Sequence, residues 1–218
     1  MASSRRQYIH ALRFSALTAL YDPLVALTAR EKHFKNALLD AAQLRPGHRV
    51  LDVGCGTGTL AIAASLRAPG LLVQGLDGDG RILRLATDKA ERAGARLAFR
   101  QGMSFSMPYL DNAFDRVLSS LFFHHLDTED KRRTLVEIQR VMKPRGELYV
   151  ADWGVPQNRL MRALFYPVQW LDGFATTQGN VEGVLPRLMG ETGFAGVRLV
   201  RQIPTLLGTL AIHAASKP

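Results

Sequence analysis

A glycine-rich segment that follows a short apolar run is the first feature of this sequence that could do chemistry. Residues 50–53 lead directly into Gly54, Gly56 and Gly58. Glycine tolerates positive φ and lets backbone N–H groups approach a ligand closely, and a helix that starts there adds partial positive charge. The segment therefore predicts a nucleotide or nucleoside site. Because residues 56–61 also satisfy the dinucleotide pattern G-x-G-x-x-G/A, the loop alone does not choose between cofactors.

Asp77 ends the next apolar run, about 20 residues beyond the loop, which is the spacing of the ribose-binding acid in dinucleotide folds. A carboxylate at the end of a strand accepts hydrogen bonds from both ribose hydroxyls. We predict that Asp77, with its neighbour Gly78, holds a ribose. Asp79 is expected to cap the helix that begins at Gly80, because Asp satisfies free N–H groups at a helix start.

Three more side chains are candidates for proton transfer. His124 and His125 are adjacent, and Tyr21 precedes an Asp-Pro break between two helical patterns. If an acceptor must lose a proton, these three residues are the predicted bases or orienting groups, with Tyr166 as a further candidate. The alternative is that one histidine packs in the core and the other caps the helix at Asp127. Adjacent residues on a regular element point in different directions, so no metal site is expected from the pair.

Short apolar runs alternate with helical patterns through the middle of the chain. The expected strands are 49–54, 71–77, 96–101, 115–120 and 147–151, and the expected helices are 58–67, 79–93 and 127–142. This alternation predicts an α/β fold with three αβα layers, a Rossmann-like and mostly parallel sheet. Strands at 197–203 and 209–215 are joined by so short a link that they must be antiparallel, which makes seven strands with an antiparallel last strand.

Two helical additions flank this pattern. Residues 1–46 are predicted to form an N-terminal helical cap, and residues 47–218 the main domain with a helical insert at 153–183. The insert follows the fifth strand, so it is expected at the carboxyl edge of the sheet, as a lid. Its aromatic residues Phe165, Tyr166 and Trp170 are predicted to wall an acceptor, although such a stripe also fits core packing. Pro167 is expected to kink or end the helix.

Composition excludes several classes of protein. The 218 residues are 47% hydrophobic, which suffices for one compact domain. A single cysteine, Cys55, excludes a disulfide framework and a Cys-rich zinc site, and is expected to serve as a small apolar side chain. No apolar stretch is long enough for a membrane span, so a cytoplasmic location is expected.

The net charge of +9 lies mainly in the flanks. Basic and acidic residues number eight and three in residues 1–50, 14 and 13 in residues 51–152, and six and three in residues 153–218. A nucleic-acid binder is not expected from so neutral a centre. The basic run 131–133 has acidic neighbours, so we interpret it as a solvated helix face.

Three further blocks follow the glycine loop in a fixed order: residues 111–120, the triplet His124-His125-Leu126, and residues 140–148. With the loop, they resemble the class I S-adenosylmethionine-dependent methyltransferases, in the group that includes the ubiquinone and menaquinone C-methyltransferases. The resemblance covers residues 49–153. It implies a seven-stranded sheet with an antiparallel last strand, S-adenosylmethionine as the methyl donor, and a small, lipophilic or aromatic acceptor.

The resemblance also implies which residues bind the cofactor. They are Asp52, Gly54, Gly56, Gly58, Asp77, Gly78, Met103, Ser104, Ser120 and Leu121. Family members usually have an acid at the position of Met103, so here Met103 is expected to cover the adenine ring and Ser104 to supply a hydrogen bond. Arg145 replaces a glycine of the family's Lys-Pro-Gly-Gly turn, which should affect the turn rather than the chemistry. Tyr21 and His125 are expected to contact the acceptor, together with the aromatic residues of the insert.

Two other functions remain open at this point. An NAD(P)-dependent oxidoreductase fits the loop, although the sequence has no Tyr-x-x-x-Lys pair. An RNA-directed or non-enzymatic protein that binds S-adenosylmethionine fits the positive charge, although the Asn-Pro-Pro-Tyr block of many nucleic-acid methylases is absent. A first helix with Arg6, His10 and Arg13 beside apolar residues also predicts peripheral contact with an anionic membrane.

Overall fold

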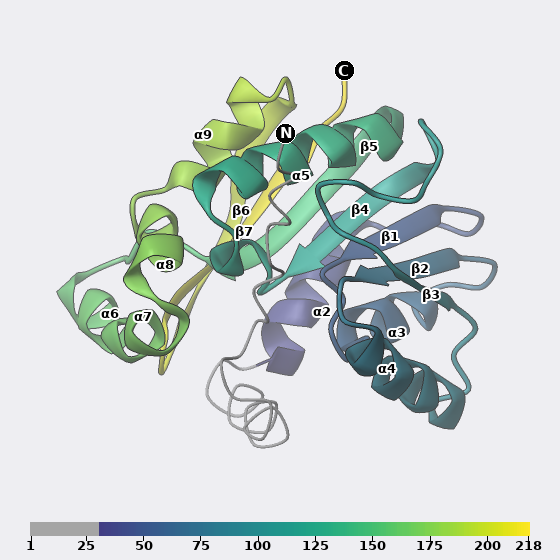
Figure 1. Cartoon of the computed structure of the whole chain (residues 1–218), viewed down its shortest axis with the longest axis horizontal. Coiled ribbons are helices and arrows are strands. Elements are labelled where there is room, and N and C mark those ends of the chain that lie inside the picture. The colour runs from purple at the N-terminus through teal and green to yellow at the C-terminus, as the bar shows by residue number, and fades with distance from the viewer. Residues whose placement is uncertain (1–30) are drawn as a thin grey trace, which may run out of the picture.

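One seven-stranded sheet organises the computed structural model, which describes residues 31–218 (Figure 1). The strand order is β3-β2-β1-β4-β5-β7-β6. The strands are β1 (Arg49–Val53), β2 (Leu72–Asp77), β3 (Ala98–Gln101), β4 (Phe114–Ser120), β5 (Met142–Trp153), β6 (Ala195–Thr205) and β7 (Gly208–Ser216). Strand β7 is antiparallel to both of its neighbours, whereas the pairs from β3 across to β5 are parallel. The predicted sheet and its C-terminal hairpin are confirmed.

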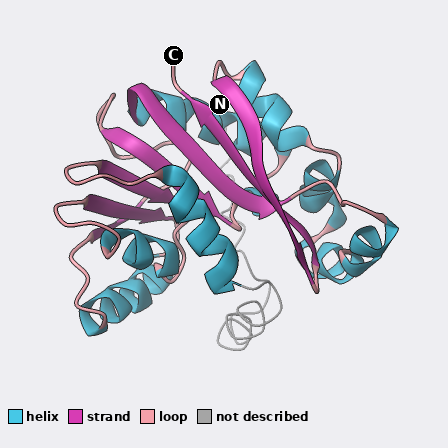
Figure 2. Cartoon of the chain, turned by 180° about the vertical axis from the view of Figure 1, so that it is seen from behind, coloured by secondary structure: helices cyan, strands magenta, loops and turns pink. Residues whose placement is uncertain are grey.

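Helices cover both faces of the sheet, as Figures 1 and 2 show from opposite sides. They are α2 (Glu31–Ala42), α3 (Thr59–Ser65), α4 (Gly80–Arg92), α5 (Thr128–Val141), α6 (Arg159–Leu164), α7 (Tyr166–Asp172), α8 (Phe174–Val181) and α9 (Val184–Glu191), with a short 3₁₀ helix η1 (Phe123–His125). One buried apolar cluster joins α2 and α3 to the sheet, and a second joins α5 and α9 to it. The three-layer αβα architecture is therefore confirmed.

The predicted N-terminal cap of residues 1–46 is described only from α2 onward. Phe34 and Leu38 of α2 are fully buried against the sheet, so this helix belongs to the core. The predicted contacts of Tyr21, and the predicted membrane-facing Arg6, His10 and Arg13, lie outside the described residues.

The fifth strand starts five residues earlier than the sequence pattern predicts. β5 begins at Met142, and Arg145 within it has a φ of +61°, a left-handed conformation that glycine adopts most easily. The backbone N–H of Arg145 donates to the carbonyl of Lys217, so the irregular segment is tied to the end of β7. Arg145 therefore holds a conformation that glycine favours, and its effect on the turn stays a prediction.

The insert forms three short helices, α6, α7 and α8, which lie beyond the ends of β5, β6 and β7 (Figure 1). The sequence pattern predicted one helix interrupted by Pro167. Instead α6 ends at Leu164 and Pro167 lies in the first turn of α7, where its missing N–H is tolerated. Among the described residues, no helix has the length and apolar composition needed to cross a bilayer.

The basic run 131–133 differs from its prediction at one position. Lys131 is 2% exposed, and its ammonium group donates hydrogen bonds to the carbonyls of Leu126 (2.7 Å) and Thr176 (2.9 Å). The long side chain thus joins the start of α5 to the insert helix α8. The prediction of a solvated face is wrong for Lys131, whereas Arg132 and Arg133 remain partly exposed.

Candidate functional site

The glycine loop lies where β1 ends and α3 begins. Gly54, Gly56 and Gly58 have φ values of +69°, +52° and +74°. Gly54 is crowded, because a Cβ there would overlap the ring of Phe122 at 2.2 Å. Gly56 is open, because a Cβ there would meet nothing within 4 Å. The middle glycine therefore presents bare backbone to free space, as a loop that receives a ligand must.

Asp77 lies beside this loop at the end of β2. Its carboxylate accepts hydrogen bonds from the backbone N–H groups of Gly56 (2.9 Å) and Asp79 (3.0 Å). Each oxygen keeps a lone pair for a further donor, such as a ribose hydroxyl. Burial raises the pKa of Asp77 and these N–H groups oppose the rise. Asp79 accepts from the Arg81 N–H at 2.8 Å, so its predicted role as the cap of α4 is confirmed.

Asp52 is the most buried carboxyl beside the loop, at 1% exposure. Neither of its oxygens has a well-formed hydrogen bond to any described residue. Burial raises the pKa of Asp52 to about 7, against the opposing charge of Lys35 and the N–H of Ala61. A buried carboxyl with so little compensation is stabilised by any positive charge that binds nearby. Neighbouring Cys55 is buried as predicted, and burial raises the pKa of its thiol.

The predicted adenine side follows β3. Met103 is half-buried and its backbone pairs with Ser106 in an isolated bridge. Ser104 is buried, and its hydroxyl shares a hydrogen bond of 2.8 Å with the hydroxyl of Thr134 on α5. Ser104 thus helps to hold this loop on α5. Its hydroxyl keeps a further lone pair, so the expected hydrogen bond to adenine stays a prediction.

Ser120 and Leu121 lie at the end of β4, which is the neighbour of β1 in the sheet. Ser120 is the last residue of β4, and the Leu121 N–H donates to the carbonyl of Ala151 at 2.9 Å. Leu121 has a φ of +51°, a conformation that costs free energy in a residue with a side chain and is concentrated at ligand sites. No sequence signal indicated this strain. Ser119, which was also missed, donates its hydroxyl to the Val53 carbonyl and joins β4 to β1.

His124 is held by an acid from the end of β5. Its Nδ1 lies 2.7 Å from Asp152 Oδ1, and its backbone N–H donates to Asp152 Oδ2 at 3.2 Å. On the other side, His124 Nε2 faces Asp172 Oδ2 of the insert at 3.6 Å. Burial lowers the pKa of His124, but the Asp152 charge and hydrogen bond outweigh it, so the net direction is upward. The two acids were missed by sequence reasoning. Asp152 lies next to the last residue of β5, so the strand-end position that identified Asp77 would also have identified Asp152.

The His125 ring lies against the His124 ring, with centroids 3.9 Å apart. Burial and the His124 charge lower the pKa of His125 to about 3. The expectation that adjacent histidines diverge is wrong for this pair, since the two rings of η1 are in contact. The alternative of a histidine cap is also wrong, since Asp127 caps α5 itself by accepting from the Asp130 N–H at 2.7 Å.

The aromatic residues of the insert do not gather into one wall. Phe165 is buried and its ring packs against Trp153, at a centroid distance of 5.3 Å. Tyr166 is half-exposed with the Arg162 guanidinium over its ring, and Trp170 is 81% exposed. The core-packing alternative holds for Phe165, and Trp170 points to solvent.

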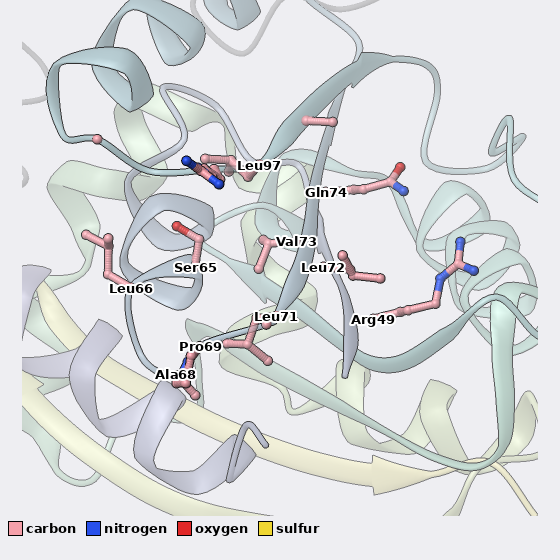
Figure 3. A pocket seen from close by; sticks show the side chains of 14 residues that line it. Arg49, Ser65, Leu66, Ala68, Pro69, Leu71, Leu72, Val73, Gln74 and Leu97 are labelled. Carbon is pink, nitrogen blue, oxygen red and sulfur yellow. The ribbon is translucent and has the colours of Figure 1, made fainter. Parts of the chain in front are cut away.

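Two hollows lie away from the loop. The larger, of about 620 Å³, is lined by Arg49, Leu72, Leu97 and neighbours at the amino ends of the first three strands (Figure 3). The smaller, of about 200 Å³, lies between Trp153, Asn180 and His213. None of the predicted cofactor residues lines either hollow. The carboxyl edge, with its open glycine and uncompensated acid, remains the candidate site.

Comparisons with known proteins agree with this geometry. Residues 50–146 match the family model described as a methyltransferase domain. Demethylmenaquinone methyltransferase of Lactiplantibacillus plantarum is 30% identical over 172 residues, which cover 75% of this chain and 70% of that protein. The enzyme of the same name from Thermus thermophilus is 28% identical, over 94% of this chain and 100% of that protein.

A solved structure shares the fold. The SAM-dependent methyltransferase from Aquifex aeolicus superposes with a TM-score of 0.68 at 21% sequence identity, and the match covers 94% of this chain and 98% of that one. Because the matching family model and the curated relatives are methyltransferases, the NAD(P)-dependent alternative is wrong. The chain belongs to the class I S-adenosylmethionine-dependent methyltransferases, in the group that includes the demethylmenaquinone methyltransferases, and is an enzyme that transfers a methyl group from S-adenosylmethionine to a small-molecule acceptor.

Proposed function

We propose that this enzyme methylates a lipophilic, quinone-like aromatic acceptor, and that the carboxyl edge of β1, β2 and β4 holds its cofactor. The observation that carries the cofactor assignment is the pairing of the open Gly56 with two acids, Asp52 and Asp77. When bound, S-adenosylmethionine supplies an electrophilic methyl group on a positively charged sulfur. The chain must then orient the acceptor, exclude water and take up any released proton.

The residues present fit such a cofactor. The remaining lone pairs of Asp77 accept the ribose hydroxyls, while the Gly56 and Asp79 N–H groups fix the orientation of its carboxylate. Ionised Asp52 is stabilised by the positive charge of the cofactor, since no described side chain forms an ion pair with it. Met103 covers the adenine ring, and the strained turn at Leu121 lines the methionine side with Ser120.

The acceptor side is formed by η1 and the insert. His124 and His125 of η1 help to orient the acceptor, and Tyr21 is the candidate that receives its proton, because burial lowers the pKa of His125 to about 3 and His124 is already paired with Asp152. Support for a quinone-like acceptor comes from the similar proteins, whose names specify demethylmenaquinone as their substrate. Quinone-like acceptors are lipophilic and reside in membranes. An exposed apolar surface on the insert that could approach a membrane therefore also supports a quinone-like acceptor.

That surface is the outer side of the insert, which we propose rests on an anionic membrane. Its exposed apolar residues are Leu160, Tyr166, Trp170, Leu171 and Phe174. Arg159 and Arg162 of α6 accompany them, and aromatic residues next to basic ones are typical of the membrane interface. Sedimentation of the full chain with phosphatidylglycerol vesicles at low salt tests this, and Trp170→Ser should weaken it. No sedimentation of the wild type, or an unchanged fraction for Trp170→Ser, would contradict it.

The main proposal is tested by incubating the enzyme with labelled S-adenosylmethionine and a panel of reduced quinones and smaller phenols. We expect transfer to quinols with an unsubstituted ring position, detected as a mass gain of one methyl group. Asp77→Asn should lower transfer about 15-fold at cofactor concentrations near the wild-type Kd, because the affinity for the cofactor falls about 30-fold. Transfer to the smaller phenols but not to the quinols would overturn the acceptor assignment. It would leave the methyltransferase assignment intact.

A further inference from the structure

The His124, His125 and Asp172 side chains bring three potential metal-binding atoms together at the interface between η1 and the insert. These atoms, one from each residue, all lie within 4.8 Å of one another. Neighbouring ligands of a tetrahedral zinc ion with bonds of about 2.0 to 2.1 Å are about 3.3 Å apart. The 3.6 Å between His124 Nε2 and Asp172 Oδ2 is close to this spacing, and the ligand atom of His125 lies within 4.8 Å of both.

Two of the three atoms are buried without a hydrogen-bond partner. His124 Nε2 and Asp172 Oδ2 make no hydrogen bond to any described residue, and their side chains are 2% and 4% exposed. In neutral His124, whose Nδ1 donates to Asp152, Nε2 presents a lone pair to Asp172, an acid that is also an acceptor; a proton on Nε2 fills the same place, and a bound metal ion would displace it. Two buried acceptors that face each other need a positive charge between them.

Asp152 supplies the second independent feature of a metal centre. Metal-binding histidines almost always donate their other ring N–H to a carboxylate or carbonyl, which fixes the tautomer and the ring orientation. Asp152 Oδ1 lies 2.7 Å from His124 Nδ1 and also accepts the Trp153 N–H at 2.7 Å, so it is itself held firmly.

We infer that His124, His125 and Asp172 form a binding site for a divalent transition-metal ion, with Asp152 as the residue that positions His124. Two imidazoles and one carboxylate suit Zn²⁺ and its neighbours in the first transition row, and are a poor set for Ca²⁺ or Mg²⁺. The ion would join the end of β5 and η1 to α7, and so fix the insert over the carboxyl edge. This inference does not depend on which acceptor is methylated.

The test uses the untagged full chain, stripped with EDTA and titrated with ZnCl₂ by calorimetry. We expect one high-affinity Zn²⁺ per chain, and a rise in Tm of about 5 °C or more at a hundredfold excess over Kd. Asp172→Asn and His125→Gln should each weaken Zn²⁺ binding at least tenfold. Asp152→Asn should weaken it by about 10- to 100-fold, because the His124 ring loses its positioning partner.

His33→Gln is the matched control, because His33 is exposed on α2 and tests whether a surface histidine binds the ion. Binding of S-adenosylhomocysteine and circular dichroism show that each variant is folded. Co²⁺ substitution adds a second readout, since a tetrahedral site with nitrogen ligands gives visible absorption bands that Asp172→Asn should remove. Zn²⁺ binding that is absent, or equally tight in folded Asp172→Asn, would overturn the inference and leave His124 as an imidazolium between two acids.

Discussion

Two parts of the carboxyl edge of the sheet hold their polar groups in different ways. We call the part around Gly56 and Asp77 the cofactor edge, and the part around His124, Asp152 and Asp172 the insert edge. At the cofactor edge, Asp77 accepts hydrogen bonds from the N–H of Gly56, in the loop 21 residues earlier in the chain, and from the N–H of Asp79. At the insert edge, the His124 side chain meets one acid from β5 and another from α7. The first arrangement relies on backbone and glycine, and the second on side chains from three separate elements. The predictions below test whether the two edges work independently.

The buried Asp52 should show the largest effect, in the pH dependence of stability. Its pKa is about 7 in the folded chain and near 3.8 when unfolded, so the folded state binds more protons between these values. Stability is therefore greatest below the unfolded pKa and falls as the pH rises through 7. The loss between pH 5 and pH 8 is about 3 kcal/mol, because the slope of about 1.4 kcal/mol per pH unit applies only up to the folded pKa of about 7.

Asp52→Asn should remove this loss while keeping the shape of the side chain. The measurement is the free energy of unfolding in urea across pH 5 to 8, for wild type and variant without cofactor. The difference between the two proteins should grow with pH in favour of Asp52→Asn. Parallel curves for the two proteins would mean that Asp52 has a partner in the full chain.

Asp77 should show the next largest effect, on cofactor affinity. Asp77→Asn replaces a charged acceptor of the ribose hydroxyls by a neutral amide, which costs about 2 kcal/mol, or about 30-fold in the Kd of S-adenosylhomocysteine. Asp79→Asn is the matched control two residues away, since Asn caps a helix as well as Asp does. Calorimetric titration of wild type, Asp77→Asn and Asp79→Asn with S-adenosylhomocysteine measures the three Kd values. Equal affinity for Asp77→Asn and wild type would place the ribose elsewhere.

The two edges also differ in how far the sequence predicted them. The glycine loop, Asp77 and the cap at Asp79 could be located because backbone conformation and capping depend on residues close together in the chain. The hydrogen-bond partners of Ser104 and Lys131 could not be predicted. Thr134 and Thr176 belong to other elements, and no local sequence pattern specifies which groups of distant elements meet. Helix boundaries in the insert were missed for a related reason, since Pro167 fits a helix start as well as a kink.

Lys131 tests the attachment of the insert edge. Lys131→Met keeps the length of the apolar stem and removes both hydrogen bonds that the ammonium group donates to the carbonyls of Leu126 and Thr176. We expect a loss of about 1.5 kcal/mol in the free energy of unfolding, with S-adenosylhomocysteine affinity unchanged. Arg132→Met, on the exposed neighbour, should change stability by less than about 0.5 kcal/mol. A change in cofactor affinity for Lys131→Met would show that the two edges are coupled.

Arg145 should show the smallest effect, with the opposite sign. Its φ of +61° is a conformation in which a side chain costs free energy and glycine does not. Arg145→Gly should therefore stabilise the chain by about 0.5 to 1 kcal/mol, measured as a rise in the urea midpoint at constant slope. Arg145→Ala is the control, because it removes the same charge and keeps the strained Cβ. Equal stabilisation by both variants would mean that relief of charge repulsion, rather than backbone strain, explains the gain. Because Arg145 is at the opposite end of β5 from Asp152, neither variant should alter cofactor affinity.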